Sequence, residues 1–173
     1  TWVQQAVDFL DALGIEQTDI VGNSFGGALA IAWAIEHPPR ILRGVLMGAM
    51  GVNFKLKEGL NAVWGYTPTV ENMKKMLDLF VYDKSIATDD LAAMRYEASI
   101  EPGFQESFAA MFPEPRQEWV DFMAYPDEEI AKIPHHTLIV HGREDQVIPI
   151  SNSYKLIDLI DDAQLHVFGH CGH

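Results

Sequence analysis

The segment Gly22-Asn23-Ser24-Phe25-Gly26 is a G-x-S-x-G motif between a strand-like run and an Ala-rich run. Residues 18–21 favour a short strand, and residues 27–36 favour a helix that Pro38 ends. A serine on so tight a strand-to-helix turn takes a strained conformation and presents its hydroxyl above the sheet edge. We expect both flanking glycines to be required, because side chains there would collide where the helix crosses the strand. The motif predicts that Ser24 is a nucleophile.

The backbone N–H of Phe25 lies at the start of this helix, where it can point toward a developing oxyanion. We therefore expect Phe25 to supply an oxyanion-hole donor. The alternative is a Gly- and Ser-rich turn that binds a phosphate or no ligand. The glycine spacing G-x-x-x-G-G is neither a dinucleotide fingerprint nor a P-loop, and no Lys-Ser or Lys-Thr pair follows.

An acidic residue follows the motif in the chain order nucleophile, acid, histidine. The apolar run at residues 137–140 is typical of a buried parallel strand, and it leads into His141-Gly142-Arg143-Glu144-Asp145. An acid just past the carboxyl end of such a strand is placed at the active edge of an α/β sheet. We predict Asp145 as this acid. Glu144 is the alternative, since adjacent side chains diverge, and a solvent-facing loop acid is the remaining one.

A histidine completes the order. A further strand at residues 164–168 leads into Gly169-His170-Cys171-Gly172-His173. We predict that His173 takes the Ser24 proton and later delivers it to the leaving group, while Asp145 fixes its tautomer. His170 is the local competitor. The other histidines, His141 among them, have the positions of structural or solvated residues.

The rest of the chain divides into three parts. Residues 1–51 and 128–173 read as two halves of an α/β core, and residues 52–127 as a helical cap. The core includes a helix over 1–13 that Gly14 closes, a strand over 44–49, and a helix over 151–160 with Ser151 as its N-cap. The cap shows helical stretches near 70–80, 89–99, 104–112 and 115–124. Some of its apolar residues either line a pocket or form cap core: Leu60, Trp64, Met111, Phe112 and Trp119.

The composition excludes several classes of protein. The 173 residues carry a formal charge of −13, which argues against a nucleic-acid partner. The single cysteine, Cys171, permits no intrachain disulfide and favours a cytoplasmic setting. No segment approaches the roughly 20 apolar residues of a membrane span, and no Cys/His spacing of the metal-binding type occurs. We expect no metal and no cofactor.

The chain resembles the α/β-hydrolase superfamily, and within it the meta-cleavage-product hydrolases of aromatic degradation. The resemblance rests on the stretches 21–27, 141–149 and 163–173, and on a middle region at 95–108. The asparagine before the serine, the arginine in the middle region and the Cys-Gly-His ending are narrower signals than G-x-S-x-G alone. The implied fold is a mostly parallel sheet flanked by helices with an inserted helical cap.

The resemblance also assigns roles to residues. Ser24, Asp145 and His173 match the triad, and Phe25 matches an oxyanion donor. Asn23 matches a polar residue that helps hold a dienol substrate, and Arg95 matches a lid arginine that binds the carboxylate or 2-oxo end. Without the resemblance, Arg95 reads as a helix-surface arginine, although a planar guanidinium suits a planar carboxylate. The implied partner is a small anionic dienol or ketoacid, and the family is commonly oligomeric.

The resemblance also implies segments that this chain lacks. These are the first strands, a glycine-rich loop with a second oxyanion donor, a tryptophan directly after the histidine, and the last helix. We therefore expect an internal fragment, truncated at both ends, whose sheet exposes apolar edges.

The implied reaction is hydrolysis of a C–C bond in a 2-hydroxy-6-oxo-2,4-dienoate, with either Ser24 or a water activated by His173 as the attacking group. A carboxylesterase or thioesterase with the same triad is the alternative, and a simple ester would not need Arg95 or Asn23. A haloalkane dehalogenase is disfavoured because that chemistry uses an aspartate in place of Ser24. A binding protein of this fold typically lacks a triad member, and all three are present here.

Overall fold

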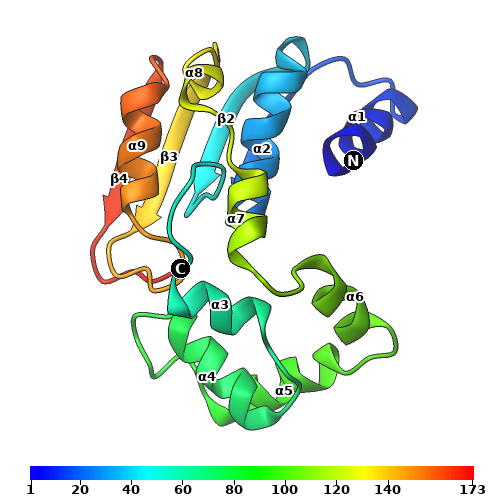
Figure 1. Cartoon of the computed structure of the whole chain (residues 1–173), viewed down its shortest axis with the longest axis vertical. Helices are drawn as coiled ribbons and strands as arrows, with labels where there is room; N and C mark the ends of the chain where they lie inside the picture. Colours follow the sequence, from blue (N-terminus) through cyan, green and yellow to red (C-terminus); the bar gives the residue numbers. More distant parts are fainter.

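The computed structural model describes all residues from Thr1 to His173. One sheet of four parallel strands runs in the order β1-β2-β3-β4. The strands are β1 (Thr18–Asn23), β2 (Ile41–Met47), β3 (His136–Gly142) and β4 (Ala163–Phe168). Because the strands are parallel, their carboxyl ends share one edge, which points toward the cap helices in Figure 1. The predicted α/β class with a parallel sheet is confirmed.

The helices fall into two groups. The helices beside the sheet are α1 (Trp2–Ala12), α2 (Phe25–Glu36), α8 (Asp127–Ile130) and α9 (Ser151–Leu159). Those between β2 and α8 are α3 (Glu58–Trp64), α4 (Val70–Phe80), α5 (Asp89–Ser99), α6 (Phe104–Met111) and α7 (Gln117–Met123). The second group gives residues 52–127 the helical content that the sequence predicts, although the exact domain boundaries stay a prediction.

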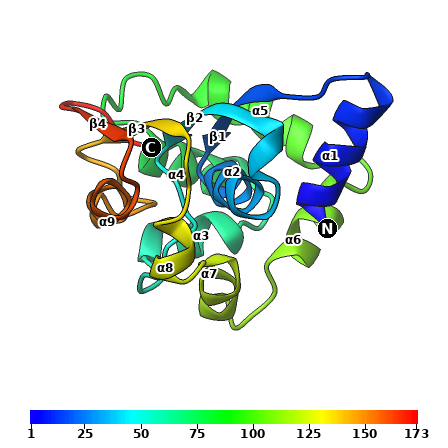
Figure 2. The same ribbon diagram turned by 90° about the horizontal axis from the view of Figure 1, so that it is seen from above.

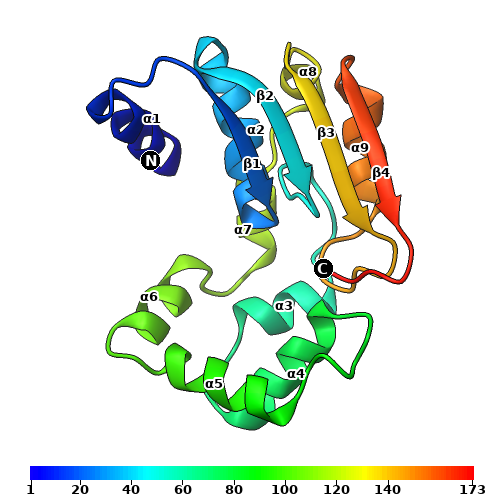
Figure 3. The same cartoon turned by 180° about the vertical axis from the view of Figure 1, so that it is seen from behind.

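One face of the sheet is covered and the other is not. Figures 1 and 2 show α2, α8 and α9 along the same face, and Figure 3 shows the strands in front with no helix over them. The register aligns Val21 with Val45 and Val45 with Leu138 on this open face. Val21 is 69% exposed and Leu138 is 37% exposed, while Ile139, which points the other way, is fully buried. The predicted parallel strand at residues 137–140 is confirmed as part of β3, but its burial is one-sided, because Leu138 is exposed.

Three hydrophobic clusters hold the elements together. A cluster of 12 buried residues, including Ile31, Ile139 and Leu156, lies between the sheet and its helices. A second cluster of 9 residues, including Met50, Leu60 and Ile148, joins the cap to the core. A third cluster of 5 residues lies within the cap. The second cluster fixes the cap over the strand ends, because its members come from both sides of that junction.

Several element boundaries differ from the sequence prediction. The strand predicted over 44–49 covers Ile41–Met47, because a 3-10 turn at Pro38–Arg40 leads directly into it and Gly48 ends it at φ +49°. Ser151 is not an N-cap: Ile150 takes that position without a side-chain bond. The helices α3 and α8 carry no strong periodic signal and were not predicted. Gly14 takes φ +67° just after α1, as a helix-ending glycine does.

No helix has the length and apolar character needed to cross a membrane.

Candidate active site

Ser24 lies at the turn between β1 and α2 in a strained conformation. Its φ of 53° and ψ of −117° fall outside the regions that a residue with a side chain prefers. Three backbone bonds hold it there: its N–H donates to Met47 O at 2.9 Å, and its C=O accepts from the N–H groups of Gly27 at 2.9 Å and Met50 at 3.1 Å. The hydroxyl forms no capping bond with α2. The turn therefore leaves the Ser24 hydroxyl free for a reactant.

The glycines around Ser24 have different roles. A Cβ on Gly22 would lie 2.4 Å from the carbonyl oxygen of Gly26, and a Cβ on Gly27 would lie 2.4 Å from the Cβ of Ala49. A Cβ on Gly26 would meet nothing within 4 Å. The expectation that both motif glycines avoid a collision is thus right for Gly22 and wrong for Gly26. The second close approach occurs one residue later, where α2 crosses the segment after β2.

Phe25 and Asn23 flank the serine. Phe25 is the first residue of α2, so its N–H has no partner within the helix. No turn or loop hydrogen bond uses this N–H either. It can therefore donate to an oxyanion beside Ser24. Asn23 is the last residue of β1 and its side chain is exposed at the same edge.

Asp145 and His173 are brought together by a hydrogen bond. His173 Nδ1 lies 2.7 Å from Asp145 Oδ2, and both side chains are almost fully buried. A carboxylate can only accept, so Nδ1 carries the proton and Nε2 is left to accept one. Asp145 Oδ1 accepts from the N–H groups of Val147 and Ile148 at 2.7 and 2.8 Å. This pair has the arrangement of a general base and its orienting acid.

The environment keeps Asp145 ionised. Burial alone would raise the pKa of Asp145, because a charged carboxylate loses its hydration. The hydrogen bonds from His141 and His173, the charge of His173 and the amide of Ile148 outweigh burial and hold this pKa well below its usual range. Asp145 therefore remains an acceptor for His173 wherever the protein is folded near neutral pH.

Glu144, the alternative acid, faces a different group. Its Oε2 accepts from the Cys171 N–H at 3.0 Å, and its own N–H donates to Cys171 O at 3.0 Å. Partial burial opposes ionisation, but the Cys171 N–H and the guanidinium of Arg143 outweigh it, and the pKa of Glu144 is lowered. His170, the alternative base, stacks on Tyr82 with ring centroids 5.0 Å apart. Glu144 therefore joins the acid loop to the histidine loop and does not contact His173.

The end of β2 lies between Ser24 and His173. The carbonyl oxygen of Met47 accepts the N–H of Ser24, and the next residue, Gly48, leaves little space for a side chain. A Cβ there would lie 3.2 Å from the His173 ring and 3.4 Å from Asp145 Oδ2. Ser24 therefore lies beside Met47, and the Asp145–His173 pair lies beside the next residue, Gly48, at the end of β2. No hydrogen bond between the Ser24 hydroxyl and His173 is present, and such bonds often tighten only when substrate binds.

The cap contacts the histidine from the other side. The ring of Phe80, the last residue of α4, stacks on His173 with centroids 5.9 Å apart. Arg95, the predicted substrate-binding residue, is exposed on α5 and forms no hydrogen bond or ion pair. The structure thus places Asn23, Phe25, Ser24, Asp145 and His173 at the strand edge and does not join Arg95 to them.

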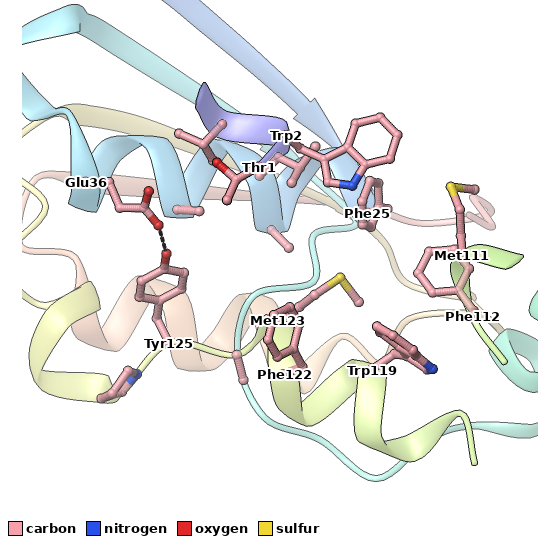
Figure 4. Close-up of a pocket in the computed structure, with 16 residues that line it drawn as sticks. Thr1, Trp2, Phe25, Glu36, Met111, Phe112, Trp119, Phe122, Met123 and Tyr125 are labelled. Carbon is pink, nitrogen blue, oxygen red and sulfur yellow. Dashed lines mark hydrogen bonds between the residues drawn. The ribbon is translucent and has the colours of Figure 1, made fainter. Parts of the chain in front are cut away.

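A separate apolar cavity of about 490 Å³ lies on the outer side of α2. Figure 4 shows Phe25, Met111, Phe112 and Trp119 around one part of it and Tyr125 hydrogen-bonded to Glu36 in another. Ser24, Asp145 and His173 do not line it. Burial and the Glu36 hydrogen bond raise the pKa of Tyr125 to about 12, so its hydroxyl is the donor. Leu60 and Trp64, by contrast, are buried in the cluster that joins cap to core.

Three residues near the site were missed by sequence reasoning. Gly48 and Phe80 contact the His173 ring only because of the tertiary fold, and no local pattern indicates them. His141 was grouped with the structural histidines, yet its Nε2 lies 3.4 Å from Asp145 Oδ2. His141 lies at the end of β3, the strand that precedes Asp145, and this position is a signal in the sequence that it lies near the site.

The comparisons with known proteins agree with this geometry. A family model described as the alpha/beta hydrolase fold matches residues 2–173. The chain is 59% identical over 172 residues to a 2-hydroxymuconate semialdehyde hydrolase from Pseudomonas sp. strain CF600, with 99% of this chain and 61% of that protein covered.

Two further relatives are similarly close. The chain is 57% identical over 173 residues to a 2-hydroxy-6-oxo-2,4-heptadienoate hydrolase from Pseudomonas putida, covering 100% of this chain and 63% of that protein. It is also 62% identical to a meta-cleavage product hydrolase from Pseudomonas fluorescens IP01. That structure superposes with a TM-score of 0.98, covering 99% of this chain and 63% of the other. The chain thus spans less than two thirds of each relative's length, and it belongs to the alpha/beta hydrolase fold family.

Proposed function

We propose that the protein hydrolyses the C–C bond of aromatic meta-ring-fission products, 2-hydroxymuconic semialdehyde or 2-hydroxy-6-oxo-alkyl-2,4-dienoates. The observation that carries the proposal is the hydrogen-bonded Asp145–His173 pair at the same strand edge as the strained Ser24. The 59% and 57% identities to relatives named for these two substrate types support it. The products are 2-hydroxypenta-2,4-dienoate and a carboxylic acid.

The proposed reaction begins with ketonisation of the dienol, which moves its hydroxyl proton to carbon. Ser24, or a water deprotonated by His173, then attacks the distal carbonyl, and the N–H of Phe25 stabilises the resulting oxyanion. The C–C bond breaks, its electron pair remains on the dienolate fragment, and a proton returns to that fragment. Where Ser24 is the attacking group, a water deprotonated by His173 then hydrolyses the acyl–Ser24 ester and releases the carboxylic acid. Overall, one water is consumed for each bond broken. His173 is the proton carrier, since its Nδ1 is committed to Asp145 and its Nε2 is free.

The leaving group of this reaction is a carbanion equivalent, so the dienolate end must be held flat and anionic. We propose that Asn23 and Arg95 do this. Asn23 lies directly before Ser24 at the strand edge. The chain carries a formal charge of −13, so an anionic substrate requires a local cation. Arg95 is suited to this task because it is exposed and makes no ion pair of its own.

We further propose a small substituent at the distal carbonyl. Met50, Val147 and Ile148 contact the triad through their backbone, because Met50 N–H bonds Ser24 O and the other two amides bond Asp145. All three residues are at most 1% exposed and belong to the cluster that joins cap to core. These buried side chains form a closely packed apolar wall beside the triad. Such a wall leaves room for a hydrogen or a short alkyl substituent on the distal carbonyl, and less room for an aromatic ring.

One observation favours the second candidate, a carboxylesterase or thioesterase. No hydrogen bond or ion pair joins the Arg95 side chain to the strand edge, and ester hydrolysis would need only the triad and the oxyanion donor. The two functions differ in their dependence on Arg95, which makes this residue the discriminating one.

The experiment compares Arg95→Ala with a matched control, Arg43→Ala, an exposed arginine of β2 paired with Asp19. We would use the chain itself and a chimera in which residues 1–173 replace the matching stretch of the strain CF600 relative. In both, this chain supplies Ser24, Asp145 and His173. We expect Arg95→Ala to lower kcat/KM for the dienolates by about 100-fold, as loss of a charge-assisted bond to a carboxylate does, while Arg43→Ala has little effect.

Nitrophenyl acetate is the second substrate in this experiment. Its hydrolysis should be equal in both variants, since it presents no carboxylate. Unchanged dienolate turnover in Arg95→Ala together with strong ester hydrolysis would reject the C–C hydrolase in favour of the esterase. We also propose that the protein acts in the cytoplasm, which its one free cysteine, Cys171, supports.

A further inference from the structure

His141 is a buried histidine that the catalytic scheme leaves without a role. It is the penultimate residue of β3, and its side chain is completely buried. Its Nδ1 lies 2.7 Å from the hydroxyl oxygen of Ser153 in α9, which is also fully buried. Its Nε2 lies 3.1 Å from Ile148 O and 3.4 Å from Asp145 Oδ2.

These contacts determine the tautomer of the neutral ring. Nε2 faces a carbonyl oxygen and a carboxylate oxygen, which can only accept, so Nε2 must carry the proton. Nδ1 then accepts the hydroxyl proton of Ser153. The opposite tautomer would place a lone pair of Nε2 against two acceptors around a completely buried ring, an arrangement that costs free energy.

We propose that His141 is a positioning residue for the Asp145–His173 pair: its Nε2–H, oriented by Ser153 and hydrogen-bonded to Ile148 O, lies 3.4 Å from Asp145 Oδ2 and holds the carboxylate electrostatically in the rotamer that meets His173. Asp145 Oδ2 lies between two imidazoles, with His173 Nδ1 at 2.7 Å and His141 Nε2 at 3.4 Å. Its other oxygen is held by the amides of Val147 and Ile148. The inference rests on the proposed function for the role of His173, but the buried contacts stand without it.

The charged groups around Asp145 come from several elements. His141 and His173 face its carboxylate directly. Lys57, Glu58 and Lys75 of the cap line an open cleft that reaches Asp145 and Gln146. The side chain of Asp145 is only 1% exposed, so these cap charges act across solvent and the two histidines dominate.

Two amide variants separate the two contacts of His141, because each reproduces the position of one ring nitrogen. The terminal amide of Asn overlays the Nδ1 side of the ring, so His141→Asn keeps an acceptor for Ser153 and loses the N–H that bonds Ile148 O and faces Asp145. The longer Gln overlays Nε2, so His141→Gln keeps the donor and loses the contact with Ser153. We expect His141→Asn to lower kcat by about 10- to 100-fold, as misplacement of a catalytic group does, with KM changed less than about twofold. His141→Gln should retain most of kcat.

The pH profile gives a readout that a merely structural role would not change. A carboxylate with one donor fewer attracts the proton of the Asp145–His173 pair more strongly. In His141→Asn, the acidic limb of the kcat/KM profile should therefore move to higher pH, and in His141→Gln it should stay in place. The inference would be overturned if His141→Asn and His141→Gln had the same melting temperature and also the same kcat and the same pH profile.

A measurement independent of turnover completes the test. Nitrogen-15 spectra of the imidazoles in the chimera should show His141 as the Nε2–H tautomer, with its signals perturbed in Ser153→Ala. The Nδ1–H tautomer would overturn the positioning role even if the enzyme is active. Failure of the proposed function is distinguishable, because it would appear as absence of dienolate turnover in the unmutated protein while these spectra remain as expected.

Discussion

At the scale of single residues, backbone strain marks the loops that carry the site. Ser24 and His170 are the only residues other than glycine with a positive φ, at 53° and 57°. Ser24 follows β1, and His170 lies three residues before His173 in the loop after β4. Such strain persists only where surrounding contacts hold the backbone in place. For Ser24 these contacts include the hydrogen bond from the Met50 N–H to its carbonyl oxygen and the bond from its own N–H to Met47 O.

The glycines of the motif give a matched pair of variants. In Gly22→Ala the new Cβ would meet the Gly26 carbonyl at 2.4 Å, whereas in Gly26→Ala it would meet nothing within 4 Å. We expect Gly22→Ala to lower the free energy of unfolding by about 1–3 kcal/mol, the cost of overpacking. Gly26→Ala should leave it unchanged or raise it by up to about 1 kcal/mol, because alanine favours a helix. Urea unfolding measures both, and equal losses would contradict the assignment of the close approach to Gly22.

The pH dependence of stability follows from Asp145. Burial would raise the pKa of Asp145, but the bonds from His141 and His173 outweigh burial and hold this pKa below the ordinary value of a carboxyl group. A lowered pKa in the folded state contributes stability above the unfolded-state value of about 3.9, and this contribution is lost as pH falls through the folded-state value. Asp145→Asn should therefore destabilise the protein by about 1–3 kcal/mol at pH 7, as lost charge-assisted bonds do.

The difference between Asp145→Asn and the unmutated protein should shrink below about pH 4, since only the unmutated protein then loses this contribution. Urea unfolding from pH 3 to pH 7 measures it. A difference that stays constant over this range would show that Asp145 is not an ionised, bonded group in the folded state.

At the scale of elements, two loops are joined into one unit that presents the histidine. The acid loop after β3 and the histidine loop after β4 exchange bonds through Glu144 and Cys171 in both directions. The Arg143 N–H also donates to Phe168 O at 2.8 Å. Glycine is required where this unit meets the cap, because a Cβ on Gly172 would lie 2.2 Å from the carbonyl oxygen of Phe80.

Gly172→Ala tests this junction. The substitution should push the histidine loop away from the end of α4, and a shift of about 1 Å at His173 lowers kcat by up to about 100-fold. Gly26→Ala is the control, since it adds the same methyl group in open space. Steady-state kinetics on the dienolate measures both variants, and full activity of Gly172→Ala would show that the loop and the cap move independently.

The elements show where sequence patterns suffice. Helices α4 and α5 begin at Val70 and Asp89 as predicted, because Thr69 and Thr88 cap them with side-chain bonds to Asn72 and Leu91 N–H. Helix α3 has no side-chain cap at Lys57 and only 7 residues without strong periodicity, whereas α7, equally short and uncapped, lies in the predicted helical stretch near 115–124. A cap is a local signal that the sequence carries, whereas a short uncapped helix depends on burial of Leu60 and Trp64 against the core.

The site divides in the same way. The sequence places Ser24, Asp145 and His173 in the loops that follow three strands, and parallel strands bring their carboxyl ends together. The choice between Glu144 and Asp145 needed the structure, since it depends on which side chain turns toward His173 and which toward Cys171. The approach of Phe80 and Gly48 to His173 joins segments that are far apart in the chain.

At the scale of the whole molecule, the sheet is covered on one face only. Val21, Met47, Leu138 and Phe168 are exposed at 37–69%, and Figure 3 shows their strands without a covering helix. Apolar surface that stays exposed does not contribute to the stability of the fold, whereas burying it would stabilise the fold by about 25 cal/mol for each Å². The 173-residue chain should therefore melt several degrees below the chimera, in which the relative supplies its remaining segments.

Thermal unfolding followed by circular dichroism measures this difference at equal protein concentration. In the chain alone, hydrogen exchange should be faster in the edge strands β1 and β4 than in β2 and β3, which have neighbours on both sides. Equal melting temperatures and uniform exchange would show that the open face costs the chain no stability.

The most direct test of the proposed function is single-substrate turnover. The chimera would be mixed with 2-hydroxymuconic semialdehyde, and loss of the yellow dienolate would be followed together with release of 2-hydroxypenta-2,4-dienoate. We expect rapid bleaching that Ser24→Ala lowers by at least about 1000-fold, the scale of loss when a triad member is removed. Bleaching that persists in Ser24→Ala, or none in the unmutated protein beside brisk nitrophenyl ester cleavage, would contradict a C–C hydrolase built on Ser24, Asp145 and His173.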